Sequence, residues 1–139
     1  MTIPIEGMFK IPHGVAIGIV LSHVMEFNLP ASHQRFAEMA KVIGEPDAAR
    51  PLRDTAAGAI LAIKRLLADL NFPRKFLDSQ VDRKAIPQMA KMIMGGLYGV
   101  YDPSKDYPLN AILPSVNIRK VTMKNLIEVY EKSFEGWEF

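Results

Sequence analysis

Apolar residues recur along this chain with the spacing of helices, and prolines and glycines separate the segments that carry them. The first such segment runs from about His13 to the Asn-Leu-Pro sequence at residues 28–30. Pro12 marks its start, because a proline pushes the residue before it out of the helical conformation. Apolar side chains surround this predicted helix on all sides, which is typical of a helix buried in a core.

Two further segments carry apolar residues on one face of a predicted helix. In residues 31–44 the apolar positions recur at i, i+3, i+4 and i+7, and Gly44 follows as a C-terminal cap. These positions are Phe36, Met39, Ala40 and Ile43. The next helix is expected from about Leu52 to Leu70, where Ala56 and Ala57 allow a neighbouring helix to approach closely. Its apolar face comprises Ile60, Ile63, Leu67 and Leu70.

The second half of the chain predicts one short turn and two more helices. Residues 79–87 can form a single turn, after which Pro87 suits the first position of a helix that glycines end near residue 99. A last helix is expected to begin after Thr122, whose side chain can cap the first turn. Its apolar face comprises Leu126, Ile127, Tyr130 and Phe134.

No segment alternates apolar and polar residues with the period of a strand. We therefore predict a single all-α, bundle-like domain of about five helices over residues 1–139. Residues 1–12 are expected to be a non-helical lead-in. Residues 101–121 contain three prolines and no helical period, so a long irregular segment is expected there. Two alternatives stay open for it: a functional lid, or an ordered crossover that fills a gap in the core. The crossover would bury Ile112, Leu113 and Ile118.

Composition narrows the class of protein. Apolar residues make up 49% and charged residues 23% of the 139 positions, which is typical of a folded globular protein. The net charge of +2 comes without a Lys/Arg cluster, so we expect neither nucleic acid nor a membrane as a partner. The apolar run at 15–24 is too short for a transmembrane span and lacks a signal-peptide cleavage site. The absence of cysteine excludes thiolate chemistry and favours a cytoplasmic location.

The candidate chemistry rests on three histidines, His13, His23 and His33, spaced ten residues apart. Ten residues of one helix place two side chains about 80° apart around the axis and about 15 Å apart along it, so His13 and His23 cannot share a metal ion. No zinc-protease motif and no Gly-rich phosphate loop is present. Because His13 lies between Pro12 and Gly14, we expect it at a helix boundary, facing a cleft rather than the deep core. From these residues alone, a packed histidine and a metal ligand remain alternatives.

The sequence IPHGVAIGIVLSHVMEFN at residues 11–28 resembles the histidine motif of the iron-containing (group III) alcohol dehydrogenases. In that motif a Pro-His-Gly sequence precedes a His-Val-Met sequence. RFAEMAKVIG resembles the helix that follows in the family, and LNFPRKFLDSQVDRKAIPQMAKM resembles its G-I-P-x-x-L-x-x-x-G-V-x-x-x-D-I-P-x-L-A segment. RKVTMKNLIEVYEKSF resembles the family's final helix, so the resemblance covers nearly all of the chain.

The resemblance implies the C-terminal half of a helical domain of the dehydroquinate synthase-like type. In the family, an N-terminal α/β domain binds NAD(P) through a Gly-rich segment, and the helical domain holds iron or zinc on one Asp and three His. His13 matches the last of these histidines, and the other three ligands would precede Met1. The family's proline before the second motif histidine is Ser22 here. The resemblance thus implies one metal ligand, His13, and no catalytic or NAD(P)-binding residue.

A single imidazole does not hold Fe²⁺ or Zn²⁺ with useful affinity, because such sites use about three protein ligands or more. We therefore expect no cofactor on the isolated chain, neither metal nor NAD(P). Two alternatives follow for its function. In the first, the chain is a C-terminal fragment or subunit of an alcohol dehydrogenase, inactive alone and active when a nucleotide-binding chain complements it. In the second, it is a free-standing, non-catalytic helical module for association or small-molecule binding.

The first long helix also predicts association. Its apolar side chains point in all directions, whereas the helices that cover it in the family would precede Met1. These side chains are Val15, Ile17, Ile19, Val20, Leu21 and Val24. Exposed apolar patches above a few hundred Å² are rare on monomers. A homo-oligomer is the simplest cover, and residues 101–121 folded across the gap are the alternative.

Overall fold

The computed structural model describes residues 1–44, 50–76, 81–95 and 117–139. Within these ranges the chain is helical and contains no strand, which confirms the predicted all-α fold class. The helices are α1 (Thr2–Phe9), α2 (His13–Asn28), α3 (His33–Ile43), α4 (Leu52–Asp69), α5 (Ile86–Gly95) and α7 (Met123–Glu135). Two 3₁₀ turns, η1 (Leu29–Ala31) and η3 (Arg83–Ala85), join them.

The expectation of a non-helical lead-in over residues 1–12 is wrong, because α1 occupies most of it. Pro4 lies in the first turn of α1, where a backbone N–H has no partner within the helix, so the proline breaks nothing. Ile5 is fully buried and anchors the helix in the core. Lys10 ends α1 in the left-handed conformation, with its N–H donating to the carbonyl of Glu6. The chain can therefore turn back and start α2.

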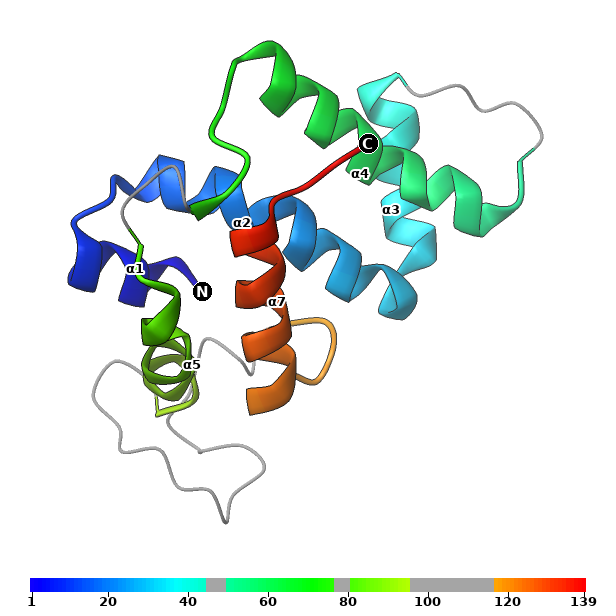
Figure 1. The fold of residues 1–139 in the computed structure, drawn as a ribbon. Coiled ribbons are helices and arrows are strands. Elements are labelled where there is room, and N and C mark those ends of the chain that lie inside the picture. Colours follow the sequence, from blue (N-terminus) through cyan, green and yellow to red (C-terminus); the bar gives the residue numbers. More distant parts are fainter. Residues whose placement is uncertain (45–49, 77–80, 96–116) are drawn as a thin grey trace.

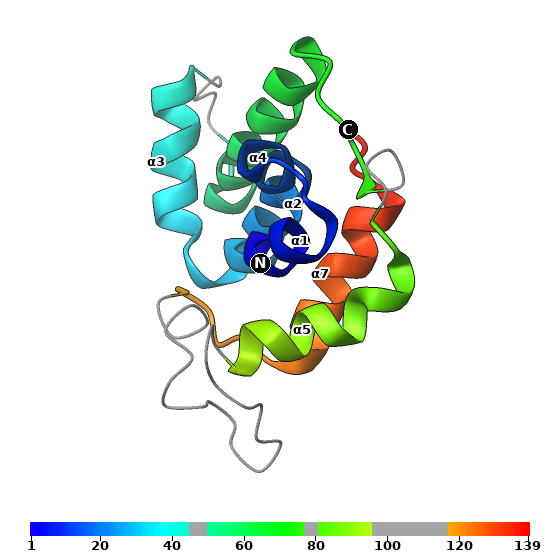
Figure 2. The same cartoon turned by 90° about the vertical axis from the view of Figure 1, so that its left-hand side faces the viewer.

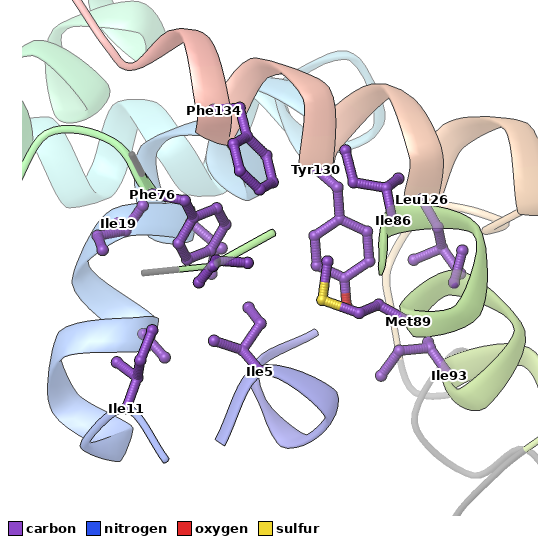
Figure 3. Close-up of a cluster of buried hydrophobic side chains, with 14 of the residues drawn as sticks. Ile5, Ile11, Ile19, Phe76, Ile86, Met89, Ile93, Leu126, Tyr130 and Phe134 are labelled. Atoms are coloured by element: carbon purple, nitrogen blue, oxygen red, sulfur yellow. The ribbon is translucent and has the colours of Figure 1, made fainter. Parts of the chain in front are cut away.

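Helix α2 lies at the centre of the fold, in contact with α1, α4 and α7 (Figure 1). Its first half packs into a large cluster with α1, α5 and α7. Figure 3 shows Ile5, Ile19, Phe76, Met89, Tyr130 and Phe134 converging there. Its second half packs against α3 and α4 in a second cluster, which comprises Met25, Phe36, Ala37, Ala40, Ala56, Ala59 and Ile60. The prediction of a core helix is confirmed, although Ile17 remains 37% exposed.

Helices α3 and α4 make the most extensive helix–helix contact in the described chain and lie side by side (Figure 2). Ala40, Ala56 and Ala59 have no exposed surface, so small residues set the close approach of the two helices. Gly44 caps α3 in the left-handed conformation at φ 92°, as predicted. Three residues of the predicted apolar faces are exposed instead, namely Met39, Ile43 and Leu70.

The predicted beginning of the last helix is also confirmed. Thr122 precedes α7 and forms a capping box with Asn125, in which each side chain accepts a hydrogen bond from the other's backbone N–H. Leu126, Tyr130 and Phe134 are buried, as their helical spacing predicted. Pro87 is the second residue of α5, one position later than predicted and still in the first turn. Both helices thus begin where local sequence signals place them.

Most of the predicted irregular segment over residues 101–121 lies outside the described residues, as does the predicted end of the fourth helix near residue 99. Ile112 and Leu113 belong to this part. Ile118 is described and is 49% exposed, so it does not fill the core as the crossover alternative required. Val121, close to α7, is buried.

The last residues fold back over the boundary between α4 and α7. Trp137 is 1% exposed, and the guanidinium of Arg74 lies 5.0 Å from the centre of its ring. Lys64 of α4 donates from Nζ to the backbone carbonyl of Glu138 at 2.8 Å. The tail therefore ties α4 to the end of α7.

By length and composition alone, residues 13–31 could cross a membrane. The core helix of a soluble protein passes the same test, and α2 buries Ala16, Ile19 and Val20 against its neighbours. We therefore interpret α2 as a core helix.

Candidate functional site

His13 is the first residue of α2, as its position between Pro12 and Gly14 predicted. Pro12 occupies the N-cap position, and its carbonyl accepts the first hydrogen bonds of the helix from Val15 and Ala16. The imidazole of His13 is 62% exposed. It is therefore open to a ligand and is not enclosed by aliphatic side chains.

Glu6 of α1 is the immediate partner of His13. Its Oε1 lies 2.5 Å from Nδ1 of the imidazole, across the connection between α1 and α2. This contact with His13 is the main reason why the pKa of Glu6 lies below its usual range, so the carboxylate is ionised at neutral pH. Glu6 was not predicted from the sequence, because a partner on a preceding helix is found only once α1 is recognised.

The structure does not bring the three histidines together. His23 is only 4% exposed and lies in the interior of α2, and His33 begins α3. Neither ring nitrogen of His23 has a hydrogen-bond partner among the described residues. Among the residues that the structure describes, no three His, Asp or Glu side chains are grouped so that they could hold a metal ion.

A cluster of polar side chains surrounds Glu26 on α2. Its carboxylate lies 3.9 Å from Nδ1 of His23, 2.9 Å from Nζ of Lys64 and 4.0 Å from Nζ of Lys132. The neighbouring His23 and the ammonium of Lys64 lower the pKa of Glu26 to about 2. At 3.9 Å the His23 contact is too long for a hydrogen bond, so Lys64 makes the firmer attraction. This group joins α2, α4 and α7 and has the composition of a structural ion pair.

A mainly apolar cavity of about 300 Å³ opens beside the exposed Ile17 of α2. Other side chains in its wall come from three helices and are Val20, Val24, Ile93, Leu126 and Val129. Asn117 supplies a polar group at the cavity and is held in place by a reciprocal amide pair with Asn28, at 3.0 and 2.8 Å. The volume and the lining match those of sites that bind small organic molecules.

The described residues fit one position of a metal site rather than a whole site. The fit rests on His13, whose Nδ1 faces a carboxylate in the way that metal-binding histidines are usually held. A metal ion bound there would need its other ligands from outside the described residues.

Comparisons with known proteins identify the family of the chain. Residues 1–134 match the sequence profile of the Fe-containing alcohol dehydrogenase family, C-terminal part. The 1,3-propanediol dehydrogenase of Citrobacter freundii is 34% identical over 128 residues, which are 92% of this chain and 29% of that protein. Lactaldehyde reductase of Escherichia coli (strain K12) is 25% identical over 134 residues, which are 96% of this chain and 31% of that protein.

The fold is also similar to solved structures. The crystal structure of a 1,3-propanediol oxidoreductase superposes with a TM-score of 0.78 and 30% identity, over 93% of this chain and 30% of that one. An alcohol dehydrogenase from Oenococcus oeni superposes with a TM-score of 0.74 and 27% identity, over 94% and 30%. This chain thus spans 29–31% of the length of these relatives. The chain belongs to the Fe-containing alcohol dehydrogenase family and corresponds to the C-terminal, helical part of its members.

Proposed function

We propose that this chain serves as the C-terminal helical part of an iron-containing, NAD(P)-dependent alcohol dehydrogenase and is active only when complemented. His13 is its one metal ligand. The observation that carries the proposal is the exposed imidazole at the start of α2, in a chain whose residues 1–134 match the family. The complementing chain or segment supplies the nucleotide-binding domain and the remaining ligands.

In this role the residues of the chain hold and orient rather than react. His13 offers a ring nitrogen to Fe²⁺ or Zn²⁺, and Glu6 fixes the other ring nitrogen. The metal, when bound, supplies Lewis acidity that polarises the oxygen of the substrate. Relatives named for 1,3-propanediol and lactaldehyde support a small alcohol or aldehyde as the substrate class. The partner is a complementing chain or a second copy of this one, and the compartment is the cytoplasm.

Complementation tests the proposal. The chain would be mixed with a 1,3-propanediol dehydrogenase that lacks its own C-terminal part, together with Fe²⁺, NAD⁺ and 1,3-propanediol. We expect no NADH from either component alone and NADH from the mixture. His13→Gln should reduce the rate to background, whereas His33→Gln on α3 should leave it unchanged. A mixture that stays inactive, or one whose activity survives His13→Gln, contradicts the proposal.

The cavity beside Ile17 favours the second candidate function, a non-catalytic module that binds a small apolar molecule. Binding of an apolar fluorescent dye distinguishes the two. This alternative predicts saturable binding of one dye per chain and its loss in Val24→Phe, which fills the cavity. Val42→Phe, at a side chain that is 89% exposed on α3, is the matched control and should bind as the wild type does. Dye binding that Val24→Phe does not weaken excludes this candidate.

A further inference from the structure

The two ring nitrogens of His13 have different surroundings. Nδ1 lies 2.5 Å from a carboxylate oxygen of Glu6, whereas Nε2 has no hydrogen-bond partner in the described part of the chain. An ionised carboxylate only accepts hydrogen bonds, so the contact places the proton of a neutral imidazole on Nδ1. Nε2 then carries the free lone pair, and this is the nitrogen that can bind a metal ion.

The contact is built by the connection between α1 and α2. The N–H of Lys10 donates to the carbonyl of Glu6 at 3.0 Å, and the left-handed turn at Lys10 reverses the chain so that α2 can begin at His13. Ile11, inside this connection, is buried and fixes it to the core. The positive end of the helix dipole of α2 also favours a carboxylate at this place. Glu6 therefore reaches His13 from an ordered backbone position.

We propose that Glu6 is a positioning residue for His13: it holds the imidazole in the tautomer with the proton on Nδ1 and directs Nε2 outward as the nitrogen that binds a divalent transition metal. The proposal deepens the proposed function and rests on His13 being a metal ligand. In this role Glu6 acts only through the ring that it orients. The stretch that carries the resemblance around His13 begins at residue 11, so it assigns no role to Glu6.

The tautomer can be measured directly by ¹⁵N NMR of the imidazole nitrogens in the full chain. The spectra are recorded at increasing pH until the ring shifts stop changing, so that the tautomer of the neutral ring is observed. We expect Nδ1 of His13 to give the shift of a protonated nitrogen and Nε2 that of an unprotonated one. Glu6→Ala should move both shifts toward a mixture of tautomers, and Glu128→Ala on exposed α7 surface should not. A wild-type ring with its proton on Nε2, or no change in Glu6→Ala, overturns the proposal.

Cobalt(II) supplies a second readout that needs neither substrate nor partner chain. Its paramagnetism broadens the ring signals of the histidine that binds it. We expect Glu6→Ala to raise the Co²⁺ concentration needed to broaden His13 by about tenfold, since losing the partner of a ligand usually weakens metal binding by 10- to 100-fold. Weaker cobalt binding with an unchanged tautomer would make Glu6 a direct ligand and overturn the positioning role. Failed complementation leaves both measurements valid, so the two proposals fail separately.

Discussion

At the scale of single residues, burial and partner decide what each imidazole can do. His13 is exposed, and its Nδ1 contacts the carboxylate of Glu6. His23 is 4% exposed and lies beside the Glu26–Lys64 ion pair. The sequence alone spaces the two histidines ten residues apart and cannot distinguish their surroundings. Only the structure shows that His13 is exposed and that His23 belongs to the interior.

Gly18 on α2 is a residue where the absence of a side chain is required. A Cβ at this position would lie 2.6 Å from Cζ of Phe72, whose ring packs onto the helix from the turn after α4. We predict that Gly18→Ala lowers the free energy of unfolding by about 1–3 kcal/mol, because the ring must move. Urea denaturation, monitored by circular dichroism, measures this change in the free energy of unfolding.

Gly14 is the matched control on the same helix, because a Cβ there meets no atom within 4 Å. Gly14→Ala should be neutral or stabilise the chain by up to about 1 kcal/mol through helix propensity. Equal effects of the two substitutions would show that Phe72 does not restrict α2.

At the scale of elements, the sequence predicted the helix ends that local sequence signals determine. Pro12 and Gly44 mark helix ends through their backbone conformation and Thr122 through its side-chain cap, and the structure confirms all three. Helix α1 was missed because its cause is tertiary: Pro4 looks like a breaker, and only the burial of Ile5 shows why the helix forms.

The apolar faces of the helices and the residues of the site were predicted only in part, because tertiary contacts decide the rest. Met39 fits the periodic pattern of α3 but is exposed, because the contact with α4 is made through Ala37 and Ala40. His13 could be placed at a helix start from its neighbours in sequence. Its partner Glu6 could not, because the pairing depends on how α1 and α2 meet.

The capping box at the start of α7 gives a prediction at this scale. Thr122→Ala removes the hydroxyl that accepts from the N–H of Asn125 at 3.2 Å. We expect a loss of about 1 kcal/mol of folding free energy, within the 0.5–2 kcal/mol range of such caps. Thr122→Ser keeps the hydroxyl and should retain most of the stability in thermal or urea unfolding. A serine variant as unstable as the alanine variant would assign the effect to the methyl group instead.

At the scale of the whole molecule, α2 joins two apolar clusters that otherwise use different helices. The first contains α1, α5 and α7, and the second contains α3 and α4. Lys64 of α4 forms an ion pair with Glu26 of α2 and a hydrogen bond with the backbone carbonyl of Glu138. These two interactions add a polar link between the helices of the two clusters. Stability of the molecule as one unit should therefore depend on the charge of Glu26.

This dependence predicts an acid transition. The pKa of Glu26 is lowered from 4.5 to about 2 in the folded chain, so the carboxylate binds protons more weakly there than in the unfolded chain. Its contribution to stability is present above pH 4.5 and is lost as the pH falls toward 2.

Glu26→Gln should flatten the decline of unfolding free energy between pH 4.5 and 2. It should also lower stability at neutral pH, because Lys64 loses its counter-charge. Glu128→Gln, at a side chain 52% exposed, should retain the wild-type profile. A profile unchanged in Glu26→Gln contradicts the assignment.

Metal content tests the central claim most directly, namely that this chain contributes one ligand, His13, to a metal site completed elsewhere. The measurement is elemental analysis after dialysis, on the chain alone and on its complex with a complementing nucleotide-binding chain. We predict no stoichiometric iron or zinc on the chain alone, about one metal ion per complex, and loss of that ion in the complex with His13→Gln. One metal ion bound per isolated chain, or a complex of His13→Gln that retains its metal, would contradict the account.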